Sequence, residues 1–107
     1  MTQHFRLETI DGITVATWIG TKVVPEATVP LYALAGDGRL LLDLGNVRFL
    51  SSNALGILVS FQKKVDAAGG RLRLCCLDPD LLELLRITKV DRIFEVFDSR
   101  QEAIRDF

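Results

Sequence analysis

The sequence predicts an α/β fold: a small domain with a four- or five-stranded mixed sheet, an N-terminal β-hairpin and about four helices. Three observations lead to this prediction. Two alternating segments flank an Asp-Gly pair near the N-terminus. A continuous apolar run, a long amphipathic segment and a second apolar run follow. The last third of the chain again alternates short apolar runs with helical patterns. Such alternation is typical of a sheet covered by helices.

Length and composition fit one domain spanning residues 1–107. Hydrophobic residues make up 49% of the 107 residues, charged residues 25%, and the formal net charge is −1. These values exclude a disordered chain and argue against nucleic-acid binding, which needs a clustered positive face. No apolar run approaches the ~20 residues of a membrane span, and the N-terminus lacks a signal-peptide pattern. We therefore expect a cytoplasmic monomer that does not insert into membranes.

The N-terminal hairpin is predicted from residues 5–10 and 13–19, where apolar and polar side chains alternate. Asp11-Gly12 between them is a strong hairpin signal because both turn positions favour positive φ. The following segment, 20–39, carries Pro25 and Pro30. Pro25 suits the first position of a short helix, whereas Pro30 would kink it, so one short helix or two irregular turns should end at Gly36 or Gly38. The residues expected to face inward are Val29, Leu31, Leu34 and Ala35.

A β-α-β unit is predicted in the middle of the chain. Residues 40–44 form an apolar run typical of a strand buried on both faces, and a helix should run from Ser52 to about Ala68. Ser51 or Ser52 would cap this helix and Gly69-Gly70 would end it. A parallel strand at 71–77 completes the unit, with a right-handed crossover. Helical spacing places four polar residues mostly outward: Gln62, Lys63, Lys64 and Asp66.

Two further helices and one strand are expected after this unit. Asp78-Pro79 opens a helix whose buried stripe is leucine-rich, and residues 93–97 form a last strand. Asp98 or Ser99 caps the final helix, since Ser99 and Glu102 have the spacing of a capping box. The leucines of the first stripe are Leu81, Leu82, Leu84 and Leu85, and the residues that dock the final helix are Ala103, Ile104 and Phe107.

The sequence shows no pattern of catalytic or metal-binding residues. Cys75 and Cys76 are adjacent, so in a strand they would point to opposite faces, and they are expected to be two buried thiols. The one histidine, His4, is distant in sequence. The aspartates at 43, 78, 80 and 91 fit structural roles at strand ends and helix caps. We therefore predict that the protein is not an enzyme and binds no metal or cofactor.

The start of the long helix is the segment most open to a functional interpretation. Two serines and Asn53 lie where backbone N–H groups are unpaired and the helix dipole is positive. A hydroxyl there either caps the helix or carries a phosphate, which this position would tolerate.

Residues 40–56 and the segments after them resemble the STAS domain, a family named after sulfate transporters and anti-sigma-factor antagonists. The resemblance covers nearly the whole chain and rests on the order and spacing of short motifs. These are Asp43-Leu44, Phe49-Leu50, Ser52, Leu55-Gly56, Gly69-Gly70, Asp78-Pro79 and Asp91-Arg92-Ile93-Phe94. This chain departs from the family pattern at three positions. The family has aspartate at the position of Ser51, a small or hydroxylated residue at Asn53, and glycine at Ala54.

A stand-alone STAS domain of this length is most similar to an anti-sigma-factor antagonist. The resemblance implies partner switching. The unphosphorylated form binds an anti-sigma factor that is also a serine kinase of ATPase fold, phosphorylation of a loop serine breaks the complex, and a phosphatase restores it. The phosphorylated serine aligns with Ser52, and Ser51 is the alternative. The implied partner-binding residues are Phe49, Leu50, Ser51, Ser52, Asn53, Ser60 and Lys63.

A second interpretation stays open. A STAS domain can also be an accessory or scaffold subunit of a transporter or of a sensory assembly, working without phosphorylation.

Overall fold

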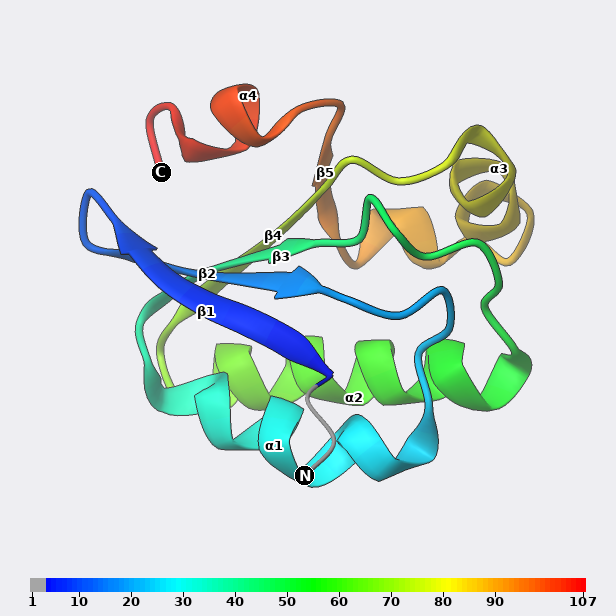
Figure 1. Ribbon diagram of the computed structural model, residues 1–107, viewed down its shortest axis with the longest axis horizontal. Coiled ribbons are helices and arrows are strands. Elements are labelled where there is room, and N and C mark those ends of the chain that lie inside the picture. Colours follow the sequence, from blue (N-terminus) through cyan, green and yellow to red (C-terminus); the bar gives the residue numbers. More distant parts are fainter. Residues whose placement is uncertain (1–3) are drawn as a thin grey trace.

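The computed structural model describes residues 4–107. Their strands form one five-stranded sheet in the order β1-β2-β3-β4-β5 (Figure 1). β1 is antiparallel to β2, and the remaining neighbours are parallel. The predicted mixed sheet and α/β fold are therefore confirmed. The strands are β1 (Phe5–Ile10), β2 (Ile13–Trp18), β3 (Arg39–Asp43), β4 (Arg71–Cys75) and β5 (Glu95–Phe97).

Helices cover both faces of this sheet. Figure 1 shows α1 and α2 beneath the sheet and α4 above it, with α3 at the end of the molecule where α2 begins. The α-helices are α1 (Thr28–Tyr32), α2 (Ser52–Ala67), α3 (Pro79–Ile87) and α4 (Arg100–Ile104), and 3₁₀ turns span Pro25–Ala27, Ala33–Gly36 and Val90–Arg92. None of the helices in residues 4–107 is both long and apolar enough to cross a membrane.

β3 is buried on both faces, as its continuous apolar sequence predicts. Leu40 and Leu42 pack into the larger core with Leu58 and Phe61 of α2. Leu41 points the other way and packs with Ala103 of α4. The period of two along the strand thus divides one apolar run between two cores.

The turn residues behave as the sequence indicates in the β-hairpin turn and after the C-terminal end of α2. Asp11 and Gly12 have φ of 52° and 78°, which closes the hairpin with Ile10 opposite Ile13. Gly69 has φ of 78° after the end of α2. A side chain at Gly70 would begin 2.5 Å from the carbonyl oxygen of Gly38, so the second glycine allows two backbone segments to meet.

Residues 25–36 form three consecutive helical stretches that end at Gly36, the first of the two predicted end points. Pro30 lies in the first turn of α1, where a missing N–H costs little. Leu31 and Leu34 face inward, but the prediction for Val29 is wrong, because this residue is 80% exposed. Val29 precedes Leu31 by two residues, about 200° around the helix, and therefore lies on the opposite side.

Two strand boundaries differ from the prediction by two residues, whereas the ends of β2 and β3 differ by at most one. β4 ends at Cys75 rather than at residue 77, because Cys76 adopts a positive φ of 67°. β5 begins at Glu95 rather than at residue 93, because a 3₁₀ turn occupies Val90–Arg92. The caps are as expected: the side chains of Asp78 and Ser99 accept hydrogen bonds from the backbone N–H groups of Asp80 and Glu102.

Candidate functional site

The loop between β3 and α2 is tied to the segment that follows β2. Asn46 Nδ2 donates a hydrogen bond to the carbonyl oxygen of Trp18 (3.0 Å), and the backbone N–H groups of Arg48 and Phe49 both donate to the carbonyl oxygen of Thr21 (2.8 and 3.2 Å). β2 and β3 are parallel, so their carboxyl ends reach the same edge of the sheet. The two loops therefore lie side by side at this edge.

Asp43 ends β3, and its carboxylate is bound from two sides. Oδ1 accepts a hydrogen bond from the backbone N–H of Gly45 (2.9 Å), and Oδ2 accepts one from Nη2 of Arg100 (2.9 Å). Arg100 also donates to Glu8 Oε1 and Thr17 Oγ1, both at 2.7 Å. The hydrogen bond with Asp43 is the main reason that the pKa of Arg100 is raised. This network joins α4 to the sheet and gives Asp43 a structural role.

Ser51 and Ser52 occupy different positions at the start of α2. Ser51 is the N-cap: its backbone is extended, and its Oγ accepts a hydrogen bond from the N–H of Ala54 at 3.0 Å. Ser52 is the first helical residue and is exposed. Within residues 4–107, its hydroxyl makes no hydrogen bond to another residue. The first turn of α2 contains no acidic side chain. A negative charge added at Ser52 would therefore be attracted by the positive end of the helix dipole, and no neighbouring carboxylate in that turn would repel it.

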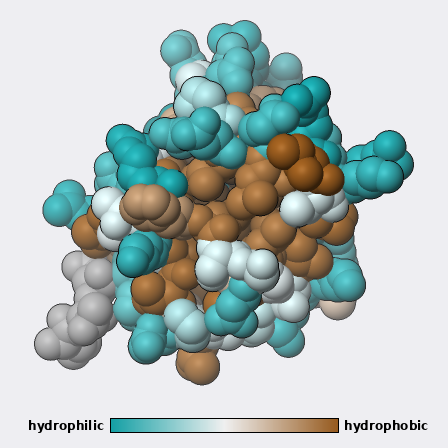
Figure 2. Space-filling model, turned by 90° about the vertical axis from the view of Figure 1, so that its right-hand side faces the viewer, coloured by the Kyte–Doolittle hydropathy of each residue, from teal (hydrophilic) through white to brown (hydrophobic). Residues whose placement is uncertain are grey.

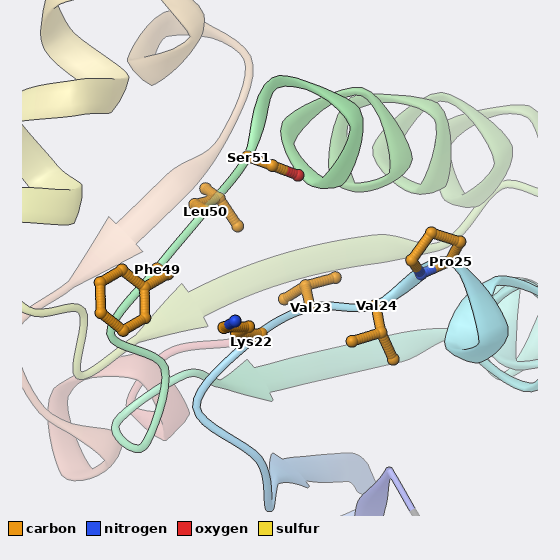
Figure 3. A pocket seen from close by; sticks show the side chains of 7 residues that line it. All are labelled: Lys22, Val23, Val24, Pro25, Phe49, Leu50 and Ser51. Carbon is orange, nitrogen blue, oxygen red and sulfur yellow. The ribbon is translucent and has the colours of Figure 1, made fainter.

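A shallow hollow of about 520 Å³ opens between the two loops, and we call it the hollow below. Figure 3 shows Leu50 and Ser51 on one side of it and Val23 and Val24 on the other. Phe49 stands at its rim with 63% of the residue exposed, and Lys22 Nζ lies 5.8 Å from the centre of the Phe49 ring. The complete lining is Lys22, Val23, Val24, Pro25, Phe49, Leu50 and Ser51.

Four of the seven lining residues were not predicted from the sequence. The motif that drew attention supplies Phe49, Leu50 and Ser51, whereas residues 22–25 come from the segment after β2. A parallel pairing of β2 and β3 would have indicated these residues, because the carboxyl ends of parallel strands lie at the same edge of the sheet.

The hollow belongs to a larger apolar surface. Figure 2 shows the face at which α2 begins: hydrophobic residues gather at its centre and hydrophilic residues surround them. A contiguous apolar surface with a polar rim is typical of a protein-interaction site. Exposed or half-buried apolar residues of the two loops, α2, α3 and the turn before β5 include Val24, Phe49, Leu50, Leu55, Leu82, Val90 and Ile93.

The predicted outward face of α2 is correct except for one residue. Ser60 and Lys63 are exposed, and Lys63 lies eleven residues after Ser52, on nearly the same side of the helix. Gln62 was expected to face outward but is only 6% exposed. It lies four residues after the buried Leu58, so it shares the buried side, and its Nε2 donates to Asp66 Oδ1 at 3.0 Å.

The sequence pattern of a known family covers most of this chain: the STAS domain pattern matches residues 7–103. The chain belongs to the STAS family. This membership confirms the resemblance that the motifs indicated, and with it the prediction of a non-enzymatic regulatory domain.

Two bacterial relatives illustrate the similarity. BtrV of Bordetella bronchiseptica, described as a candidate anti-sigma factor antagonist, is 30% identical over 106 residues, which are 94% of this chain and 91% of that protein. A Thermotoga neapolitana protein with the same description is 32% identical over 71 residues. That second alignment covers 66% of this chain and 63% of the relative, so it spans less than two thirds of the Thermotoga protein.

Solved structures of bacterial proteins share this fold. The anti-sigma-factor antagonist (STAS) domain protein from Planctomyces limnophilus has a TM-score of 0.82 at 23% identity, with 92% of this chain and 93% of that chain covered. The Bacillus cell fate determinant SpoIIAA, solved in its phosphorylated form, has a TM-score of 0.66 at 16% identity, with 94% and 96% covered. At these identities the likeness establishes the fold alone.

One departure from expectation in this STAS domain concerns the cysteines. They were expected to point to opposite faces, but the Sγ atoms of Cys75 and Cys76 are 3.3 Å apart. Cys75 is buried, and Cys76 is half-buried. An oxygen of the Asp43 carboxylate lies within 4.8 Å of both sulfur atoms. The positive φ of Cys76 explains the difference, because it turns the second side chain out of the strand alternation.

Proposed function

We propose that this STAS domain is an anti-sigma-factor antagonist that acts by partner switching. Its unphosphorylated form binds an anti-sigma factor that is also a serine kinase of ATPase fold, and so releases a sigma factor. Phosphorylation of Ser52 ends the complex, and a phosphatase restores it. The kinase consumes ATP, so this cycle operates in the cytoplasm, where we expect the protein to be a monomer.

The observation that carries the proposal is the position of Ser52. Its exposed hydroxyl is at the first residue of α2, next to Ser51, which lines the hollow. The names of the similar bacterial proteins support the same function. A kinase can reach this hydroxyl, and a partner that covers the hollow would also cover it.

The physical effect of the phosphate differs between the free protein and the complex. A phosphate adds about −1.5 to −2 charges at neutral pH. In the free domain this charge lies at the positive end of α2, where attraction of ~0.3–1 kcal/mol leaves the fold nearly unchanged. In the complex the same charge would lie in a desolvated interface, where an unpaired charge costs several kcal/mol. The switch therefore acts on binding and not on folding.

Affinity capture with matched baits tests the proposal. Wild type, Ser52→Ala and Ser52→Asp proteins are each immobilised and exposed to lysate of the native cells, and the retained proteins are identified by mass spectrometry. We expect an ATPase-fold kinase on the wild type and on Ser52→Ala, and its loss on Ser52→Asp. Gln101→Glu is the control, because it adds one negative charge to α4, on the opposite face of the sheet.

One observation favours the second candidate function, a scaffold or transporter accessory that is never phosphorylated. Ser51 replaces the aspartate that the family carries before the phosphorylated serine. In that case the captured partner would be a transporter component or another STAS protein, and Ser52→Asp would retain it.

A further inference from the structure

The adjacent thiols at the end of β4 are held together by an uncommon backbone conformation. Residues in an extended strand alternate between faces, so two neighbours normally keep their side chains apart. Cys76 instead has φ of 67°, a region that residues other than glycine seldom adopt. Its thiol donates to the sulfur of Cys75 at an Sγ–Sγ distance of 3.3 Å. The fold therefore places two sulfur atoms in contact.

The two thiols differ in their access to solvent. Cys75 is 0% exposed and packs with Ala103 of α4. Burial raises the pKa of the Cys75 thiol, and the hydrogen bond from Cys76 and the charge of Asp43 raise it further. Cys76 is half-buried and has an open side. A small oxidant from solvent therefore meets Cys76 first, while Cys75 remains a protonated thiol behind it.

The surroundings of the pair disfavour a metal ion. Asp43 could supply a third ligand, but its carboxylate already accepts hydrogen bonds from Gly45 and Arg100. The guanidinium of Arg100 places a positive charge beside the cluster, and Cys75 resists the deprotonation that a metal ligand requires. The reaction that two thiols in contact can still undergo is oxidation to a disulfide between them.

We propose that Cys75 and Cys76 are a redox pair that hydroperoxides oxidise to a vicinal disulfide. The thiolate of Cys76 attacks one oxygen of hydrogen peroxide, the O–O bond breaks, and hydroxide leaves and takes up the released proton as water. Cys76 is then a sulfenic acid. The sulfur of Cys75 attacks it, an S–S bond forms, the S–O bond breaks, and the hydroxyl leaves as water with the Cys75 proton. Two thiols and one peroxide give one disulfide and two waters.

The resulting bond should be easy to reduce. The Cα atoms of neighbouring residues are about 3.8 Å apart, whereas ordinary disulfides join Cα atoms that are ~4.4–6.8 Å apart. A bond formed outside this range is strained, and strained disulfides are the labile and regulatory ones. Such a reversible bond is compatible with a reducing compartment, where stable disulfides are rare.

Oxidation of the reduced, folded wild-type chain tests the proposal. The protein is treated with hydrogen peroxide, remaining thiols are blocked with an alkylating agent, and the intact mass is measured. We expect a monomer lighter by two hydrogen atoms that takes up no alkylating agent. The tryptic peptide spanning residues 74–86 contains both cysteines and should carry the cross-link. Dithiothreitol should restore both thiols.

Single variants identify the role of each thiol. Cys75→Ser removes the second thiol, so Cys76 should proceed to a sulfinic acid. Cys76→Ser should leave Cys75 reduced under the same treatment. If the change at the buried Cys75 prevents folding, the intact mass and the peptide map of the oxidised wild type decide the question. The proposal is overturned if the wild type forms a sulfinic acid at Cys76 while Cys75 stays free, if the disulfide joins two copies, or if both thiols survive the treatment.

Discussion

Arg100 shows how one side chain can fix the layers of this domain. From α4 it reaches Asp43 on β3, Thr17 on β2 and Glu8 on β1, which are three adjacent strands. Asp43 is 9% exposed, so its carboxylate is largely shielded from water and is hydrogen-bonded by Arg100 and by the N–H of Gly45 instead. α4 is only five residues long and would dock weakly by apolar contacts alone. The ion pair therefore helps to hold α4 on the sheet, in addition to the apolar contacts of the small second core around Ala103 and Leu41.

Arg100→Ala should destabilise the protein by about 1–3 kcal/mol. The change leaves a nearly buried carboxylate without its cation, which is the costly way to break an ion pair, and the partial exposure of Arg100 reduces the cost. Urea unfolding measures the effect. Arg86→Ala is the matched control, because its ion pair with Glu83 is exposed on α3 and should contribute little to the free energy of unfolding. Equal effects of the two changes would contradict the structural role of Arg100.

At the scale of the elements, the strands and helices follow from apolar periodicity and caps, and the discrepancies have local causes. The hairpin, β3, α2, α3 and α4 are where the sequence predicts them. Gln62 and Val29 were assigned to the wrong sides, because the inner face of a helix depends on which neighbours it meets. The early end of β4 depends on the positive φ of Cys76, for which the Cys-Cys pair carries no sequence signal.

The capping of α2 yields a prediction that separates the two serines. Ser51→Ala should lower the free energy of unfolding by about 1 kcal/mol, because the N–H of Ala54 loses its side-chain acceptor. Ser52→Ala should change it by less than about 0.5 kcal/mol, as expected for an exposed side chain. Thermal or urea unfolding of both variants provides the measurement. A larger loss for Ser52→Ala would show that Ser52 is the structural serine.

At the scale of the whole molecule, the candidate site is a property of topology. The sequence supplied the serines and Phe49, but the hollow exists because the parallel strands β2 and β3 deliver two loops to one edge. Residues 22–25 carry no motif of their own, so only the assembled sheet identifies them as neighbours of Leu50. The apolar surface around the hollow likewise combines segments from both halves of the chain.

Exposed residues of this surface should matter for binding and not for folding. Phe49→Ala should weaken affinity for the kinase partner about tenfold or more, because exposed aromatic side chains are frequent hot spots, and its melting temperature should stay unchanged. Lys63→Glu tests whether the interface extends along α2. Leu7→Ala is the control: Leu7 is also exposed, but lies in the middle of β1, opposite Ala16. Isothermal titration calorimetry measures these affinities. Equal affinities of Phe49→Ala and Leu7→Ala for the kinase would show that Phe49 is not part of the binding surface.

Mapping the phosphorylated residue tests whether this protein acts by partner switching through Ser52. The protein is incubated with its captured kinase partner and ATP, the modified residue is mapped by tandem mass spectrometry, and the affinity of the modified protein for the kinase is measured. We expect one phosphate, on Ser52, with binding lost and the melting temperature unchanged. A phosphate on Ser51, or no phosphate on either serine while binding persists, would contradict it.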